Sequence, residues 1–431
     1  MSLPRPWLIF LTGLAIGMVS GCGRGVTAAA PDPSTPVAWV ELTGAGPELR
    51  VTSSNGRCPD AEIDGQPRST TLRSPTTADF PAVCTLAVPA DTKRLSLGGK
   101  LLPLLHGTPQ RIVIIGDTGC RIQGLAAQAC NDPAAWPFPA VAARAAAEKP
   151  DLVIHVGDYY YREDPCPLGK SVCAGSPHGD HWPTWRAEFF DPAAPLLTQA
   201  PVILVRGNHE ECRRGGEGWF RLLDASPWRG GCDDLSNAFA AKAGDLTFGV
   251  LDSSAAEDRS APEGAVADMA RQFAALQPEL AKGESFILTH RPIWAMVPAA
   301  RLGPLGTLSI AINRTEQAAA RDAIPDTTRM IIAGHIHHFA AYSFGAARPA
   351  QLVAGEGGDE PLPADRPRFD RTPATIDGLP ASRLSFARYG YVVMERDGDA
   401  WKIVAHEVDG RIAANCRLTG RTLTCDTDRP R

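Results

Sequence analysis

Five short apolar runs in the 431-residue chain end in a small residue followed by a side chain that can bind a metal ion. These positions are Gly116-Asp117, Gly157-Asp158, Gly207-Asn208-His209, Thr289-His290 and Gly334-His335-Ile336-His337. With the phenol of nearby Tyr161, they supply enough carboxylate, amide and imidazole donors for two metal ions. This mixture of donors suits iron, manganese or zinc better than calcium, which prefers oxygen ligands.

Two metal ions about 3.5–4 Å apart can share one carboxylate and clamp the attacking and leaving oxygens of an in-line displacement. Asp158 is the natural bridging carboxylate in this set. The donors therefore favour hydrolysis at phosphorus.

The elements that must position these residues can be read from the chain around them. From residue 111 onward, apolar strands alternate with Ala-rich helical stretches, which is typical of an α/β fold built on a layered sheet. We expect strands at 112–115, 152–156, 202–205, 246–251, 286–288 and 330–332, and helices at 139–148, 265–280 and 315–323. Ligands collect outside the carboxyl ends of strands in such sheets, so the five motifs should converge on one crevice.

Short alternating segments on both sides of this region predict further β-structure. Segments 38–42, 48–51 and 84–88 favour a small β domain over 37–108, and the domain with the motifs would then span 109–428. Near the C-terminus, segments 389–395, 401–406 and 411–418 alternate again, which predicts a meander packed on the sheet.

The first 21 residues are typical of a secretory signal rather than of a folded element. Arg5 precedes an apolar stretch over 7–19 that is short for a membrane span. The following Val19-Ser20-Gly21-Cys22 resembles a bacterial lipobox, so Cys22 would carry the lipid and 22–36 would form a flexible tether. We expect an exported lipoprotein, periplasmic or anchored to the outer membrane; the alternative is an ordinary signal peptide with an incidental cysteine.

The cysteine count also supports export. The chain has eleven cysteines, and without Cys22 ten remain, an even number suited to disulfides in an oxidising compartment. Although sequence alone does not determine connectivity, we predict bridges between neighbours: Cys58–Cys84, Cys120–Cys130, Cys166–Cys173, Cys212–Cys232 and Cys416–Cys425. Zinc binding by these thiols is the less favoured alternative, because the chain has no CxxC pair.

The net charge is −5 and the pI is near 6.1, so the composition indicates no basic face for nucleic-acid backbones.

The motifs in order resemble those of a known family. Gly116-Asp117-Thr118-Gly119, Gly157-Asp158-Tyr159-Tyr160-Tyr161, Gly207-Asn208-His209-Glu210, Ile287-Leu288-Thr289-His290 and Gly334-His335-Ile336-His337 look like the five motifs of calcineurin-like metallophosphoesterases. The resemblance covers about residues 111–358 and is closest to the purple acid phosphatase branch. It implies a β-sandwich flanked by helices, in αββα layers.

The branch is indicated by a departure from the usual pattern. Most of the superfamily has a histidine two residues after the first aspartate, where this chain has Gly119. Tyr161 lies three residues after Asp158, and in purple acid phosphatases a tyrosine at that spacing binds iron(III). A phenolate is a hard anionic donor suited to a trivalent ion. Tyr159 and Tyr160 are substitutes that the family spacing does not favour.

The resemblance implies two ligand sets and one acid. The ferric site would contain Asp117, Asp158, Tyr161 and His337, and the site for a divalent iron, zinc or manganese ion would contain Asp158, Asn208, His290 and His335. His209 would bind no metal and would act as the acid or charge stabiliser for the leaving group. A metal-bound hydroxide would attack phosphorus directly, with inversion.

These residues imply an acid-phosphatase-type hydrolase that cleaves small phosphate monoesters. The alternatives are a phosphodiesterase acting on nucleotides or lipid headgroups and, in another class, a non-catalytic metal-binding lipoprotein of the cell envelope. The presence of His209 argues against the last, because a binding protein does not need the acid.

Several residues beside the motifs are open to more than one interpretation. Five of them flank the motifs and either support a ligand from behind or, for the arginines alone, grip the phosphate: Arg162, Glu163, Arg206, Glu210 and Arg291. Asp252 is expected in a turn or behind the ligands, while His155 and His338 are expected to be packing residues. His178 and His181 are expected on a surface loop; the less favoured alternative is that they line the substrate cleft. The glycines of 355–358 should allow the backbone to pass close to the metals.

Overall fold

The structure is a computed structural model that describes residues 34–301, 307–361 and 369–427. The chain divides into two units after Asp32, and all the described residues belong to the second. The expected signal peptide 1–21, Cys22 and most of the expected tether 22–36 lie outside the described residues. Within the described part of the chain, every helix is too short or too polar to span a membrane.

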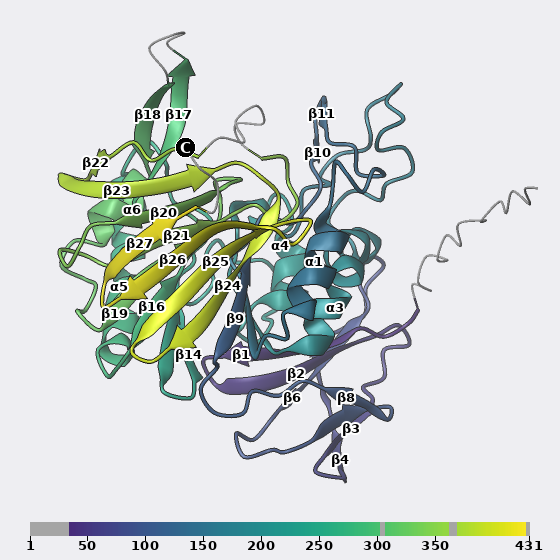
Figure 1. The fold of residues 1–431 in the computed structure, drawn as a ribbon. Helices are drawn as coiled ribbons and strands as arrows, with labels where there is room; N and C mark the ends of the chain where they lie inside the picture. Colours follow the sequence, from purple (N-terminus) through teal and green to yellow (C-terminus); the bar gives the residue numbers. More distant parts are fainter. Residues whose placement is uncertain (1–33, 302–306, 362–368, 428–431) are drawn as a thin grey trace, which may run out of the picture. The chain divides into compact units, whose positions relative to one another are not determined.

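The second unit is organised around two sheets, which Figure 1 shows as ribbons. The first has eleven strands in the order β27-β26-β25-β24-β9-β12-β13-β1-β2-β6-β5. Their bounds, in chain order, are β1 Ala38–Thr43, β2 Gly46–Ser53, β5 Thr71–Ser74, β6 Ala82–Ala87, β9 Arg111–Ile115, β12 Leu152–His155, β13 Val202–Leu204, β24 Gly390–Asp397, β25 Ala400–Glu407, β26 Ile412–Thr419 and β27 Thr422–Asp426.

The second sheet has eight strands in the order β14-β15-β16-β19-β21-β20-β23-β22. Their bounds are β14 Phe239–Ala243, β15 Leu246–Val250, β16 Ser285–Leu288, β19 Thr328–Ala333, β20 Phe339–Ser343, β21 Ala350–Ala354, β22 Ala374–Ile376 and β23 Leu379–Phe386. The smaller sheets pair β10 Ile122–Gln123 with β11 Ala126–Ala127, pair β17 Ala295–Arg301 with β18 Thr307–Ile312, and join β3 Asp60–Ile63, β4 Gln66–Ser69, β7 Leu95–Leu97 and β8 Lys100–Leu102.

Helices cover the outer faces of the two large sheets. The α-helices are α1 Phe138–Ala147, α2 Trp182–Trp185, α3 Asp191–Gln199, α4 Gly216–Gly218, α5 Glu263–Leu280 and α6 Arg314–Ala319. Two π-helical turns, Arg186–Phe190 and Trp219–Leu223, and one 3₁₀ turn, Asn208–Glu210, complete the helical segments that the structure describes.

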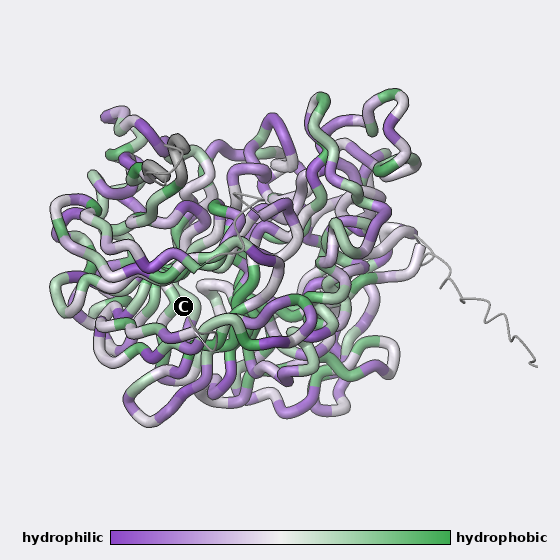
Figure 2. The backbone as a smooth tube through the Cα atoms, turned by 45° about the horizontal axis from the view of Figure 1, so that its top comes forward, coloured by the Kyte–Doolittle hydropathy of each residue, from purple (hydrophilic) through white to green (hydrophobic). Residues whose placement is uncertain are grey.

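Alternation along the strands divides the apolar side chains between the layers. Ile112 and Ile114 of β9 face a core shared with Phe286 of the second sheet, whereas Val113 and Ile115 face the core that contains α1 and α3. A third core joins the second sheet to α5 and α6. Figure 2 shows hydrophobic segments along the central strands. The αββα layering that the sequence predicts is confirmed.

The predicted elements around the motifs are present. The six expected strands correspond to β9, β12, β13, β15, β16 and β19, and the three expected helices correspond to α1, α5 and α6. All five predicted disulfides are also present: Cys58–Cys84, Cys120–Cys130, Cys166–Cys173, Cys212–Cys232 and Cys416–Cys425.

The N-terminal and C-terminal β-segments differ from the expectation in how they attach. The segment 37–108 was expected as a domain of its own, but Glu41 of β1 pairs in parallel with Val202 of β13, so its first strands extend the large sheet. The expected meander likewise continues the sheet, because Val393 of β24 pairs antiparallel with Val113 of β9. Such pairings between distant segments leave no local sequence signal.

Candidate metal centre

All five motifs lie at strand ends that meet in space. In the first sheet, β9, β12 and β13 are parallel neighbours, and Asp117, Asp158 and Asn208 follow them. In the second sheet, β16 and β19 are parallel neighbours, and His290 and His335 follow them. Two groups of possible metal ligands result: Asp117, Asp158 and His337, and Asp158, His290 and His335. The convergence expected from the strand ends is therefore observed.

Tyr161 completes the first group. Its hydroxyl donates to Asp158 Oδ2 at 2.8 Å and lies 3.3 Å from Asp117 Oδ1 and 3.1 Å from His337 Nε2. The other two tyrosines of the motif point elsewhere: the Tyr159 hydroxyl donates to a backbone carbonyl, and the Tyr160 ring stacks on Trp185. Of the three phenols, Tyr161 is the one within the cluster.

The second group shares an oxygen atom with the first. Asp158 Oδ2, which accepts the Tyr161 hydroxyl, also lies 3.2 Å from His290 Nε2. The same His290 nitrogen lies 3.2 Å from Asn208 Oδ1. Asp158 thus stands between the two groups, where a bridging ligand is needed.

Three of these residues have left-handed backbone conformations. The φ angles are 53° at Asp117, 58° at Asp158 and 70° at His335. Residues other than glycine seldom adopt positive φ, and such conformations concentrate at functional sites where surrounding contacts hold them. The turn after each strand aims the side chain into the cluster.

Hydrogen bonds orient the imidazoles. His290 Nδ1 lies 2.8 Å from the Val156 carbonyl oxygen, which can only accept, so Nδ1 carries the proton and Nε2 is left for the cluster. His337 Nδ1 lies 3.2 Å from the Glu360 carbonyl oxygen, with Nε2 again on the cluster side. Both rings therefore present a lone pair to the groups of ligands.

Gly119 occupies a position with no room for a side chain. A Cβ atom there would overlap the Tyr161 ring and would lie 2.7 Å from Glu188 Oε1. A histidine at 119 and Tyr161 in its present position therefore exclude each other. The glycines of 355–358 were expected to let the backbone pass close to the cluster. Gly355 does so, since a Cβ atom on it would lie 2.7 Å from Asp117 Oδ2.

The Glu210 carboxylate holds two motif loops together. Its Oε1 accepts the backbone N–H groups of Tyr159 and Tyr160 at 2.9 and 3.1 Å, and its Oε2 accepts those of Asp158 and Gly207 at 3.1 and 2.9 Å. Glu210 is fully buried. These contacts place Glu210 behind the ligands, in a supporting role.

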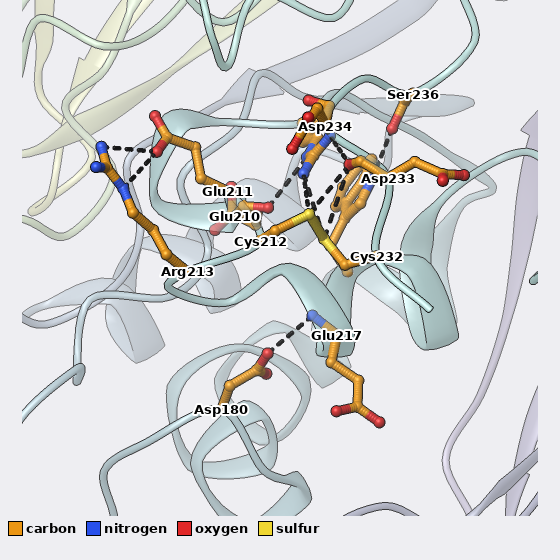
Figure 3. Close-up of a disulfide and its surroundings, with 12 residues drawn as sticks. Asp180, Glu210, Glu211, Cys212, Arg213, Glu217, Cys232, Asp233, Asp234 and Ser236 are labelled. Atoms are coloured by element: carbon orange, nitrogen blue, oxygen red, sulfur yellow. Dashed lines mark hydrogen bonds and ion pairs between the residues drawn. A yellow bond between two sulfur atoms is a disulfide. The ribbon is translucent and has the colours of Figure 1, made fainter. Parts of the chain in front are cut away.

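Arg206 has the same kind of role at the back of the third motif. Its guanidinium donates to the Glu210 carbonyl at 3.0 Å and to Asp252 Oδ2 at 3.1 Å, and it lies beside the Cys212–Cys232 disulfide. Figure 3 shows this disulfide joining the loop after Glu210 to a second loop. Because Arg206 is 1% exposed, it supports the loops and does not reach a substrate.

His209 lies at the edge of the cluster with two charged partners. Its Nδ1 is 2.8 Å from Glu163 Oε1, and its ring centroid is 3.8 Å from that of Tyr161. Arg214 NH2 lies 2.5 Å from the same Glu163 oxygen and 3.0 Å from His209 Nε2. Burial lowers the pKa of His209, although the charge of Asp158 and the hydrogen bond with Glu163 act to raise it. The Glu163 carboxylate also orients the ring.

Two further networks support the other histidines. His335 Nε2 lies 3.2 Å from Asp258 Oδ1 and 3.0 Å from Arg291 NH1, and Arg291 pairs with Asp258. Arg291 is therefore placed behind a ligand, one of the two roles considered for it. His337 Nδ1 lies 3.2 Å from buried Asp359 Oδ2, and Asp359 pairs with Arg121.

Arg121 also contacts the first group directly. Its guanidinium carbon lies 4.8 Å from the centroid of the Tyr161 ring. A cation over the ring face is attracted by the electrons of the ring. Arg121 and Asp359 therefore link Tyr161 to His337 behind the cluster.

The buried charges act strongly on one another. Burial, followed by the charge of Asp158, raises the pKa of Asp117 well above its ordinary value, and burial together with both carboxylates raises the pKa of the Tyr161 phenol. Burial also acts to raise the pKa of Asp158, but His290 and His209 outweigh it and lower that pKa. Burial and then Arg291 lower the pKa of His335 to about 4. The cluster therefore combines crowded acids with an imidazole, that of His335, whose protonated form is disfavoured.

The remaining sequence candidates lie outside the cluster. His155 is buried, and its Nε2 lies 2.9 Å from Thr118 Oγ1, as expected for a packing histidine. His338 is buried as well. Asp252 accepts from Arg206 and from the Ser236 backbone at 2.6 Å, which gives it a role in joining loops.

The sequence analysis missed five residues that contact the cluster or its loops: Arg121, Glu188, Arg214, Asp258 and Asp359. Four of them lie in loops without a recognisable motif, or in a helical segment. Asp359 directly follows the glycines of 355–358, so its position beside a motif was the one available signal.

Comparison with known proteins agrees with this geometry. A family model described as calcineurin-like phosphoesterase matches residues 110–339. No curated protein matches the chain in sequence. The structure titled "Structure of PhoD" is similar with a TM-score of 0.55 at 11% identity, and the match covers 93% of this chain and 94% of that chain.

A plant enzyme is similar to the same degree. The purple acid phosphatase PPD1 from yellow lupin (Lupinus luteus) seeds gives a TM-score of 0.54 at 13% identity, covering 89% of this chain and 74% of that chain. At such low identities, these two likenesses establish the fold alone.

Proposed function

Because the chain belongs to the calcineurin-like phosphoesterase family, we propose that it hydrolyses phosphate monoesters at the cluster around Asp158, with two bound metal ions. The observation that carries this proposal is the position of Asp158 Oδ2, which lies within 3.2 Å of both Tyr161 and His290. One carboxylate between two groups of donors is the arrangement that a dinuclear hydrolase requires.

The donors present fit two metal ions. The first ion would be held by Asp117, Asp158, Tyr161 and His337, and the second by Asp158, Asn208, His290 and His335. The fully buried Asp117 and Tyr161 are crowded by the Asp158 charge, and a cation among them would relieve this repulsion. When bound, the ions would supply a nucleophile derived from water and positive charge for the phosphoryl oxygens.

The chain's own groups complete the reaction. His209, held by Glu163, is placed to give a proton to the leaving oxygen. Arg214, whose NH2 lies 3.0 Å from His209 Nε2, adds a positive group at the same edge. The positive charge of Arg214 beside the cluster favours a terminal phosphate with two charges, as in a monoester, over a diester with one.

The contacts of Tyr161 support an iron(III) ion in the first group. A phenolate is a hard anionic donor, and Gly119 leaves the room that the Tyr161 ring occupies. We therefore assign iron(III) to the group with Tyr161 and a divalent iron, zinc or manganese ion to the group with His290.

Two substrates test the proposal. Purified protein with its native metals should hydrolyse p-nitrophenyl phosphate, and should hydrolyse bis(p-nitrophenyl) phosphate more slowly. Asp158→Asn should lose most activity and bound metal, whereas Asp252→Asn, a matched buried carboxylate behind the loops, should keep its metals. Faster cleavage of the diester would favour the phosphodiesterase alternative. Wild-type activity in Asp158→Asn would overturn the proposal.

We also propose that the protein is an exported lipoprotein that carries its lipid on Cys22. Five disulfides in the described chain suit an oxidising compartment. Labelling of expressing cells with a palmitate analogue should mark the full chain and not Cys22→Ala. Equal labelling of both would contradict the assignment.

A further inference from the structure

A π-helical turn lies directly behind the first group of ligands. The helical segment from α2 to α3 contains the turn Arg186–Phe190, in which hydrogen bonds span one residue more than in an α-helix. Such turns are frequent at functional sites because the extra residue displaces a side chain from the regular helical surface. The residue at the centre of this turn is Glu188, which is 1% exposed.

The Glu188 carboxylate is occupied by backbone groups of two motif segments. Its Oε1 accepts the N–H of Cys120 at 2.7 Å and the N–H of Tyr161 at 3.0 Å. Its Oε2 accepts the N–H of Arg162 at 3.2 Å. Glu188 therefore ties the segment after the first motif to the backbone of the residue whose phenol enters the cluster.

The same carboxylate helps to close the position that a side chain at 119 would need. A Cβ on Gly119 would lie 2.7 Å from Glu188 Oε1 and would overlap the Tyr161 ring. The space beside the first group is thus filled from two directions, by the ring and by the carboxylate. A ligand to this group can come from 161 and not from 119.

We propose that Glu188 is a positioning residue that places the Tyr161 phenol in the first metal group. It acts through the Tyr161 and Cys120 amides and accepts no hydrogen bond from the phenol itself. The inference rests on the proposed dinuclear function. According to this inference, binding of a metal by Tyr161 depends on Glu188, which lies in a distant helical segment.

Metal binding to protein stripped of its metals tests this role. Calorimetric titration of the wild-type apoprotein with Zn²⁺ should show two binding events. Glu188→Gln should weaken one of them by roughly 10- to 100-fold and leave the other unchanged, because loss of a group behind a ligand typically lowers metal affinity by that factor. In iron-reconstituted protein, the tyrosinate absorption per bound iron should fall in parallel.

Glu41→Gln is the matched control. Glu41 is also a fully buried carboxylate, and it lies 2.8 Å from Arg50 of the neighbouring strand. The control should lower the unfolding midpoint without changing either Zn²⁺ affinity. Gly119→Ala supplies an independent variant, because the added methyl group should displace the same Tyr161 ring. In the double variant, the losses of Zn²⁺ binding free energy caused by Gly119→Ala and Glu188→Gln should be less than additive.

The outcomes separate the two proposals. If Glu188→Gln and Gly119→Ala bind both Zn²⁺ ions as tightly as the wild type, or if both affinities fall by the same factor, the positioning role is wrong. A wild-type protein that binds two ions but hydrolyses no phosphate ester would overturn the proposed function alone. A wild type that binds fewer than two ions would overturn both.

Discussion

Asp158 and Tyr161 determine what the cluster can bind. One Asp158 oxygen serves both groups, and the Tyr161 hydroxyl lies within 3.3 Å of Asp117, Asp158 and His337. Neither residue is distinctive alone, since an aspartate after a strand is usually a turn residue. The short distances between their side chains are what indicate a metal site.

Replacing Tyr161 by phenylalanine should remove the visible absorption of the iron-loaded protein. In the proposed ferric site the band would arise from charge transfer between a bound phenolate and iron(III), and phenylalanine has no phenolate to bind. Activity should fall by about tenfold or more, as for other losses beside a metal. Absorption spectra with iron analysis measure both effects.

Tyr160→Phe is the control for this experiment, because the Tyr160 ring stacks on Trp185 instead of entering the cluster. It should keep the band. A colourless and fully active zinc or manganese enzyme would show that the ferric assignment is wrong.

His209→Asn should slow some substrates far more than others. A general acid contributes about 10²- to 10⁴-fold when the leaving oxygen needs a proton. The loss should therefore be large for an alkyl phosphate and small for p-nitrophenyl phosphate, whose leaving group departs as an anion. Comparison of kcat for the two substrates measures the difference. Equal losses would assign His209 to charge stabilisation instead.

At the scale of elements, single carboxylates tie separate loops together. Glu210 joins the second and third motifs, and Glu188 joins the segments after the first and second. Asp180 does the same further out, where it accepts from Trp185 Nε1 at 2.8 Å and from the Glu217 and Gly218 backbones. Figure 3 shows its bond to Glu217 beneath the disulfide loop.

The contribution of Asp180 to the stability of the folded protein depends on pH. Burial raises the pKa of its carboxyl from 3.8 to about 6. The folded protein then holds the proton more tightly than the unfolded chain, so this group's contribution to stability is present below pH 3.8 and is lost as pH rises through about 6. Asp180→Asn resembles the protonated form at every pH.

The free energy of unfolding of Asp180→Asn, relative to wild type, should therefore increase between pH 4 and 6 and level off above that range. Urea unfolding at several pH values, with the disulfides intact, measures this difference. A difference that does not change with pH would show that Asp180 titrates normally.

At the scale of the whole molecule, two sheets must meet for either metal group to exist. Asp158 follows a strand of the first sheet, whereas His290 and His335 follow strands of the second. A bound ion therefore links the two sheets and should stabilise the folded chain by mass action.

Removal of the metals should lower the melting temperature, and their return should restore it. An ion present at a thousand times its dissociation constant contributes about 4 kcal/mol. Differential scanning calorimetry before and after chelation measures the shift. Asp158→Asn should show a much smaller shift, and an equal shift in both proteins would place the stabilising ions elsewhere.

The αββα layers were predicted from the resemblance of the motifs to a family, whereas local patterns in the sequence were enough to predict the motif strands and the five disulfides. Each of these depends on residues that are near one another along the chain, such as the apolar run before Asp117 or the neighbours Cys166 and Cys173. Glu188 and Asp258 reach the cluster from distant segments. No spacing rule identifies such residues, and the joining of β1 to β13 was missed for the same reason.

The pairing of β9 with β24 has a consequence for how the protein can fold. The strand that leads into Asp117 lies between β12 and a partner close to the C-terminus, and Val113 opposite Val393 is among the most distant contacts of the sheet. Contacts that close such long loops form late. A nascent chain cut short before Gly390 would carry all five motifs and still expose one side of β9 as an unpaired edge, which favours aggregation. Pairing with β24 therefore protects the edge of the strand that leads into Asp117, although every proposed ligand lies before β24 in the chain.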